Sequence, residues 1–263
     1  MEKLDKKTIV GLIIAAIIVV VGIICLALFN SKGKPASEEE LTAANNAYKE
    51  YVFSMTYGYG TKYDGIDKLY EKDETTYDTL HRNVILNAAT RYATDHLEIA
   101  ITKEKENALK TQYGYTNNYV AYNGDAIKEA VKILYGKEWE HGSGLNDNLF
   151  GYDFNYIATL DVYVRTKSTS YYNSDGSYSL DYKTIKAVRK KDKVILTVAI
   201  AYAYKYEDKY VYTSDSTSTN TIYEVSKDEL GIKEDSIDKF PKYEITFAVD
   251  SENNYIFESI KKA

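Results

Sequence analysis

The stretch KVILTVAIAYAYKYE, residues 193–207, decides the fold of this chain. It is rich in β-branched and aromatic residues and predicts a strand, in which successive side chains point to opposite faces. One face would carry bulky side chains such as Val198 and Ile200, and the other would carry small ones such as Ala199 and Ala201. Either the bulky face is core, or the small face lies under a helix and leaves the tyrosines exposed; we favour the first arrangement.

Five tyrosines in and just after this stretch are the candidate ligand-facing side chains. If their face is exposed, it would suit carbohydrate or peptide. The chain has 28 tyrosines but only seven phenylalanines and one tryptophan, so the competing interpretation is that tyrosine supplies most of the aromatic packing between strands. The five candidates are Tyr202, Tyr204, Tyr206, Tyr210 and Tyr212.

Four more segments predict strands, because they are rich in β-branched and aromatic residues and are bounded by turn signals. They are residues 155–166, 180–190, 243–249 and 254–260. The predicted turns are residues 173–176, 190–193 and 250–253, and residues 213–221 form a loop or a hairpin tip.

Three helices are predicted before these strands. The first spans residues 38–54, where Ser37 and Glu40 have capping-box spacing. The second spans about 76–98, and the third about 124–135, with Asn123 as its cap and Gly136 at its end. Three shorter assignments complete the pattern: residues 55–65 are a glycine-rich loop, residues 99–123 are either helix or loop, and residues 226–231 are a short helical turn.

Helices followed by an antiparallel meander predict an α+β fold. We expect a curved antiparallel sheet that wraps the helices, as in the NTF2-like or cystatin-like architecture. The alternative is a helical part that extends to about residue 140, followed by a separate sheet part.

An apolar run without charge, TIVGLIIAAIIVVVGIICLALF, occupies residues 8–29. At ~1.5 Å per residue it reaches about 33 Å, enough for an N-terminal transmembrane helix. It is longer than the apolar region of a cleaved signal, so an uncleaved anchor is expected. Ile24 before Cys25 argues against a lipidated cysteine. Residues 1–7 are then a tail, 30–37 a linker and 38–263 a folded domain.

The lysines around this run suggest which way it crosses the membrane. Three precede it and two follow it, at Lys32 and Lys34, which favours a cytoplasmic N-terminus. Residues 38–263 are therefore expected outside the cell membrane, with the lipid bilayer as a partner through residues 8–29.

The charge of the chain excludes one class of partner. The net charge is −6, and residues 1–35 carry five lysines and two acids, so the remaining residues carry −9. Because no basic patch stands out, nucleic acid is not an expected partner.

The sequence has no motif that specifies a reaction. The histidines His81, His96 and His141 lack metal-ligand spacing, and we interpret all three as solvent-facing. Cys25 is the only cysteine, and the segment 173–176 is an incomplete calcium loop. We expect no catalytic residue, no cofactor and no metal.

The lysine-flanked run, the helix AIKEAVKILYGKEW and the terminal hairpin KYEITFAVDSENNYIFESIKK resemble uncharacterised single-pass membrane proteins of low-GC Gram-positive bacteria. The resemblance implies a compartment and no activity. The expected function is a membrane-anchored, extracytoplasmic, non-catalytic module that binds an envelope protein or a cell-wall ligand. The alternatives are an accessory subunit of a cell-envelope assembly and a cell-envelope enzyme.

Overall fold

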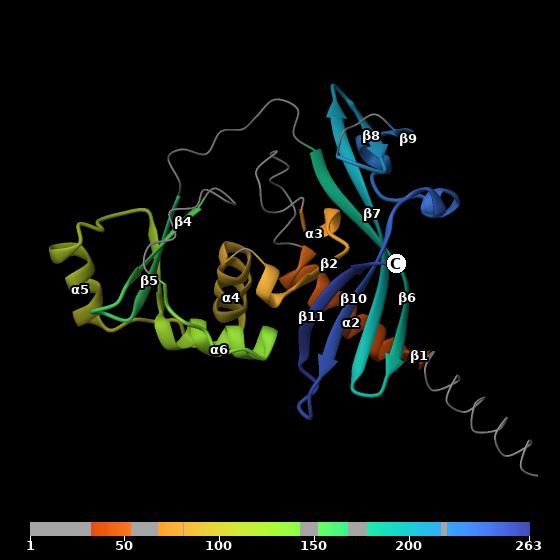
Figure 1. The fold of residues 1–263 in the computed structure, drawn as a ribbon. Helices are drawn as coiled ribbons and strands as arrows, with labels where there is room; N and C mark the ends of the chain where they lie inside the picture. The colour runs from red at the N-terminus through yellow and green to blue at the C-terminus, as the bar shows by residue number, and fades with distance from the viewer. Residues whose placement is uncertain (1–32, 54–67, 81, 143–151, 168–177, 217–219) are drawn as a thin grey trace, which may run out of the picture.

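The computed structural model describes residues 33–53, 68–80, 82–142, 152–167, 178–216 and 220–263. These residues form two antiparallel sheets, with helices α4 and α6 between them (Figure 1). The larger sheet contains residues 193–206, and the smaller sheet lies at the other end of the molecule.

The larger sheet is built around one long strand, β7. Its main strands run in the order β1 (Lys34–Pro35), β6 (Tyr178–Lys190), β7 (Lys193–Tyr206), β10 (Lys242–Val249), β11 (Tyr255–Lys262) and β2 (Glu74–Thr76). Two further strands belong to this sheet: β8 (Lys209–Thr213) pairs with β7, and β9 (Thr221–Ser226) pairs with β8.

Strand β7 is paired along both edges. One edge pairs with β6, from Tyr178 opposite Tyr204 to Lys190 opposite Lys193. The other edge is shared, because residues 193–199 pair with β10 and residues 202–206 pair with β8. Strand β7 is therefore the element on which the other strands of this sheet are aligned.

Both faces of β7 are buried. The bulky side chains, which include Val198, Ile200 and Tyr202, belong to the main core under the helices. The small side chains Ala199 and Ala201 lie in a second cluster on the opposite face, covered by residues of β8, β9 and the 227–240 segment. The prediction that the bulky face is core is thus confirmed.

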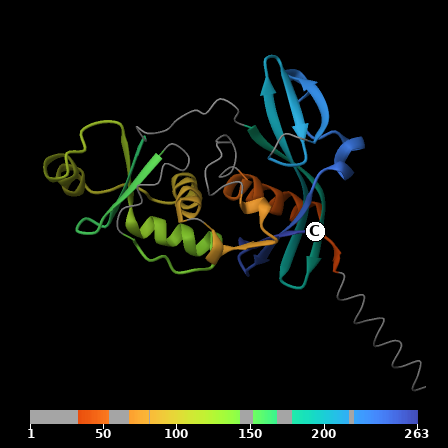
Figure 2. The same cartoon turned by 45° about the horizontal axis from the view of Figure 1, so that its top comes forward.

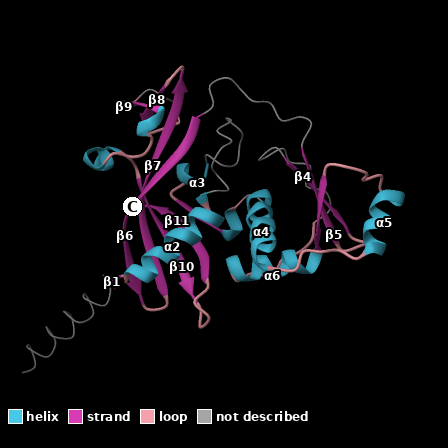
Figure 3. Cartoon of the chain, turned by 180° about the vertical axis from the view of Figure 1, so that it is seen from behind, coloured by secondary structure: helices cyan, strands magenta, loops and turns pink. Residues whose placement is uncertain are grey.

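Five α-helices occur among the described residues. Helix α2 lies across one face of the larger sheet, α6 packs against β11, and α4 packs against α2 and α6 (Figure 3). The five are α2 (Glu38–Tyr51), α3 (Lys68–Glu71), α4 (Arg82–His96), α5 (Lys103–Gln112) and α6 (Gly124–Tyr135). Two predicted helices are confirmed with their caps. Ser37 and Glu40 form the capping box of α2, and Asn123 caps α6, which ends at Gly136 in the left-handed conformation.

The smaller sheet has three strands in the order β3 (Tyr119–Asn123), β5 (Val162–Lys167) and β4 (Tyr152–Ile157). Helix α5 packs on one of its faces, where Leu109 is fully buried against Ile157, Val162 and Val164. Figure 2 shows α5 at the far end and α6 on the side that faces the larger sheet.

For the described residues, the expected fold class, in which helices are followed by one curved NTF2-like or cystatin-like sheet, is wrong. The structure is a mixed α/β arrangement with two antiparallel sheets, and strands β1, β2 and β3 lie between or before the helices in the sequence. Among the helices that the structure describes, none combines the length and the apolar character needed to cross a bilayer.

Three segment assignments also need correction. The second helix, expected at about 76–98, is α4 at Arg82–His96, and Thr76 belongs instead to strand β2, which pairs with β11. The ambiguous residues 99–123 contain α5 and then strand β3. The single strand expected at 155–166 is a hairpin, β4 and β5, that turns at residues 158–161, where Asp161 adopts a positive φ of 48°.

Other predicted elements agree with the structure. Strands β6, β10 and β11 cover the segments predicted at 180–190, 243–249 and 254–260. The helical turn predicted at 226–231 is a short 3-10 helix, Lys227–Glu229, and two more such turns span Tyr77–Thr79 and Glu234–Lys239. The predicted anchor at 8–29, Cys25, the loop at 55–65 and the turn at 173–176 lie outside the described residues.

The tyrosine hydroxyls buried beneath α2 provide a test of the main core. Tyr48 is fully buried, and its hydroxyl lies 2.7 Å from that of Tyr70. Replacing Tyr48 by Phe should lower the free energy of unfolding by about 1 kcal/mol, because a buried hydrogen bond is lost without creating a cavity. The control is Tyr206→Phe at a side chain that is 55% exposed, where we expect less than ~0.5 kcal/mol. Urea denaturation measures both, and equal effects would contradict this packing.

Candidate functional site

The five candidate tyrosines do not form one exposed face. Tyr202, Tyr204 and Tyr212 are buried, Tyr210 is half-buried, and Tyr206 is exposed. Tyr202 packs edge-on against Tyr178 in the main core. Only the last of these positions along β7 therefore presents its ring to solvent.

Tyr212 holds the second cluster together. Its hydroxyl donates to the carboxylate of Asp181 at 3.0 Å and accepts from the backbone N–H of Gly231 at 2.8 Å. Burial raises the pKa of Tyr212, and the neighbouring Asp181 raises it further. The Tyr212 side chain connects β8 with β6 and with the 227–240 segment. It is buried and cannot reach a ligand in this structure.

The histidines were interpreted as solvent-facing, and for His141 that interpretation is wrong. The side chain of His141 is only 9% exposed. His96 hydrogen bonds through Nε2 to the hydroxyl of Tyr51 at 3.0 Å, and His81 lies outside the described residues. Among the residues that the structure describes, no group of three or more His, Cys, Asp or Glu side chains could hold a metal ion.

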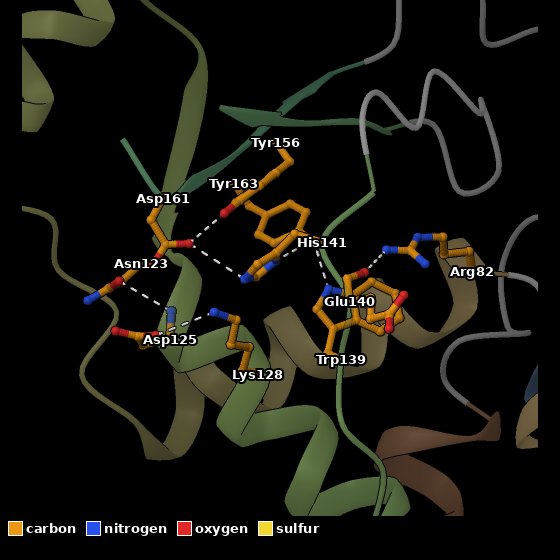
Figure 4. Close-up of polar contacts among 10 residues, drawn as sticks. All are labelled: Arg82, Asn123, Asp125, Lys128, Trp139, Glu140, His141, Tyr156, Asp161 and Tyr163. Carbon is orange, nitrogen blue, oxygen red and sulfur yellow. Dashed lines mark hydrogen bonds and ion pairs between the residues drawn. The ribbon is translucent and has the colours of Figure 1, made fainter. Parts of the chain in front are cut away.

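His141 lies in a polar and aromatic cluster on the face of the smaller sheet opposite α5 (Figure 4). Its ring stacks on Tyr156 of β4, with centroids 4.2 Å apart and planes at 14°. Its Nδ1 is 2.9 Å from the hydroxyl of Tyr163 on β5, and that oxygen also accepts from Nε1 of Trp139 at 2.8 Å. Its Nε2 has no hydrogen-bond partner in the structure and lies 3.5 Å from the carboxylate of Asp161.

The segment 137–142, which follows α6, contributes Trp139 and His141 to this cluster. On its other side it meets the start of α4, where the guanidinium of Arg82 lies 4.0 Å from the centre of the Trp139 ring. Arg82 also donates to the backbone oxygen of Glu140. The segment is thus held between a cation of the helical layer and the aromatic face of the smaller sheet.

Asp161 joins the β4–β5 turn to the start of α6. Its backbone oxygen accepts from the N–H of Gly124 at 3.0 Å, and its carboxylate accepts from the hydroxyl of Tyr156 at 2.8 Å. A side chain at Gly124 would place Cβ only 2.0 Å from the carboxylate of Asp161. The carboxylate also lies by the amino end of α6, where the helix dipole favours negative charge.

Burial and charge act together on the titratable groups of this cluster. Burial lowers the pKa of His141 below its ordinary value of 6.5, and the positive charge of Lys128 lowers it further, whereas Asp161 opposes both. Burial also raises the pKa of Tyr156 and of Tyr163. Neutral imidazole and neutral phenols are therefore the forms that this arrangement favours. These groups bond to one another, so the cluster serves as a junction between elements.

A groove of about 500 Å³ lies between α2 and β6. Helix α2 contributes Leu41, Thr42 and Asn45, and residues 182–185 of β6 form the other wall. Asn45 is fixed by the hydroxyl of Thr184, which donates to its side-chain oxygen at 2.6 Å. The groove walls are neutral polar and apolar apart from Lys183.

Strand β6 bends at this groove. The pairing of β6 with β7 shifts between Thr184 and Lys186, which leaves Ile185 as an extra residue. Its side chain is 38% exposed, unusual for a large aliphatic residue in a sheet. The β-branched and aromatic residues of this segment predicted the strand, but not the bulge.

The outer edge of β6 is largely uncovered by the described chain. The two-residue strand β1 pairs only with Val188 and Arg189, and the backbone N–H of Ala36 then donates to the oxygen of Ala187. From Lys186 back to Tyr178, no described strand pairs with this edge. At ~3.3 Å per residue, the open edge extends roughly 30 Å.

Comparison with known proteins adds no relative. No protein-family model, curated protein or solved structure matches this chain.

The contact between Gly124 and Asp161 predicts a strong coupling between two distant positions. Gly124→Ala should lower the free energy of unfolding by about 1–3 kcal/mol, because its Cβ would overlap the carboxylate of Asp161. In an Asp161→Gly background the same change should cost much less, since the clashing side chain is gone and glycine suits the positive φ at 161. A double-mutant cycle by denaturant unfolding measures the coupling, and additive effects would refute the contact.

Proposed function

We propose that this protein is a non-catalytic interaction module that accepts an extended segment of a partner protein along the outer edge of β6. The observation that carries the proposal is the open edge of β6 with a groove beside it. An added strand would satisfy the backbone groups of this edge, which is a recurrent mode of peptide recognition.

The groove supplies a place for side chains of such a segment. In an added strand, alternate side chains point toward the α2 face. There they would meet Leu41 and Ile185, which offer apolar contact, and Asn45 and Thr184, which offer polar contact. The segment that fits best therefore has an apolar residue at the position facing the groove.

Charge favours a foreign segment over a second copy of this chain. Strand β6 carries Lys183, Lys186, Arg189 and Lys190 against a single acid, Asp181, whose carboxylate is held by Tyr212. Lys186 is exposed and has no ion-pair partner among the described residues. Because like charges across a strand pair are destabilising, an acidic segment complements this edge, whereas a second β6 would repeat its cations.

The surroundings of the groove support binding rather than catalysis. Its only titratable wall residues are Tyr182 and Lys183, and Lys183 forms an ion pair with Glu234 at 2.7 Å. General acid–base chemistry needs a pair of positioned groups within reach of one substrate. The His141 cluster packs against β4 and β5 of the smaller sheet, whereas the groove lies beside β6 of the larger sheet.

A place outside the cell membrane is part of the proposal and rests on the sequence. The apolar run at 8–29 and its flanking lysines support a cytoplasmic N-terminus, with the folded residues on the other side. A reporter enzyme that is active only outside the membrane, fused after Ala263, tests this location. An inactive reporter that is present at normal abundance would refute it.

The binding proposal predicts a charge and shape preference. A library of random linear peptides displayed on phage, selected on the full chain, should yield sequences that alternate apolar and acidic residues. Lys186→Glu should weaken their binding roughly fivefold, about 1 kcal/mol, because an exposed attraction becomes a repulsion. Ile185→Asp should weaken binding further, since it places a charge beside the apolar part of the groove.

The matched control is Lys103→Glu, which makes the same charge change on α5 at the opposite end of the molecule. It should leave the affinity of the selected peptides unchanged. Peptides that bind the wild type and the Lys186 and Ile185 variants equally would place the binding surface elsewhere and overturn the proposal.

A further inference from the structure

The His141 cluster contains a chain of hydrogen bonds whose direction is fixed by its chemistry. The indole nitrogen of Trp139 can only donate, so the hydroxyl oxygen of Tyr163 accepts from it at 2.8 Å. The single proton of that hydroxyl then points to Nδ1 of His141 at 2.9 Å. The carboxylate of Asp161, 3.5 Å from Nε2, favours the neutral imidazole that carries its proton on Nε2, so that Nδ1 accepts from the Tyr163 hydroxyl.

Protonation of His141 disrupts this chain. A charged imidazole has a proton on both nitrogens. Nδ1 and Nε1 of Trp139 would then both donate to the hydroxyl oxygen of Tyr163, and the hydroxyl proton would lose its acceptor at Nδ1. The new charge would also lie in a side chain that is only 9% exposed.

The other groups around the ring do not remove this conflict. From α6, Lys128 and Asp125 act in opposite directions on His141, and from α4 the charge of Arg82 disfavours its cation. From the β4–β5 turn, Asp161 favours the cation, but its carboxylate already accepts from Tyr156 and lies 3.5 Å from Nε2. Burial is the largest influence, and it favours the neutral ring.

We propose that His141 is a proton-operated latch, in which uptake of one proton releases the segment 137–142 from the smaller sheet. In the neutral state, the stacking on Tyr156 and the bond to Tyr163 fasten this segment across β4 and β5. In the protonated state those contacts are lost, and the smaller sheet is held to the helical layer by fewer bonds.

The sign of the pH dependence follows from linkage. A histidine whose pKa is lower in the closed state than in the open state binds a proton preferentially when the latch opens. The closed state therefore keeps its full stability above the ordinary pKa of 6.5 and loses it as the pH falls from there toward the lower pKa of the closed state. One proton changes the opening equilibrium by at most about tenfold per pH unit.

The test is hydrogen exchange of backbone amides in the full chain between pH 7.5 and 5, corrected for the intrinsic pH dependence of exchange. Opening of β4 and β5 should increase by up to about tenfold per pH unit below 6.5. Amides of β7 are the internal control and should show no such increase. His141→Asn should abolish the dependence, because its amide oxygen can accept from Tyr163 and cannot take up a proton.

A second measurement does not depend on any variant folding well. Nitrogen-15 shifts of the imidazoles in the wild type should show one histidine with a bare Nδ1 whose pKa lies below 6.5. If all three histidines titrate at 6.5 or above, or if β4 and β5 open equally in wild type and His141→Asn, the latch is refuted.

Discussion

The burial of β7 on both faces is the constraint on which the rest of the structure depends. On the face of β7 that carries alanines, a covering segment can approach the strand backbone closely. On the face that carries large side chains, the covering helix lies farther from the backbone. Helix α2 covers the bulky face, and the 227–240 segment covers Ala199 and Ala201 on the other. Each fully buried aliphatic side chain stabilises a fold by about 1.5–3 kcal/mol. Exposing either face of β7 would therefore lower the free energy of unfolding substantially.

The sequence predicted best those elements whose signals are local. The helix at Gly124–Tyr135 has a cap at each end and an apolar stripe, and the final hairpin has two runs of β-branched and aromatic residues around a polar turn. Strands β2 and β3 were missed because they are only three and five residues long and are defined by distant partners. The pairing of Thr75 with Ile260 cannot be predicted from the residues near either position, because the two are far apart in the sequence.

The same distinction applies to the candidate sites. The alternation of tyrosines in β7 is visible in the sequence, but whether each ring is buried depends on segments that are remote along the chain. His141 lies in a polar stretch, and only the fold brings it against Tyr156 and Tyr163. The bulge at Ile185 could not be predicted from the sequence either, because it arises from a register shift between β6 and β7.

The entry of the chain into the larger sheet has a mechanical consequence. Gly33 adopts a φ of 72°, and any side chain there would meet Val188 at 2.5 Å, so the backbone lies flat against β6. Strand β1 then adds two residues of pairing, and Glu40 on α2 lies 3.3 Å from Arg189. A force transmitted through the preceding residues would act first on this small shear contact. The open edge of β6 begins where the pairing with β1 ends. Tension on the chain and a strand added along this edge would therefore both act on β6.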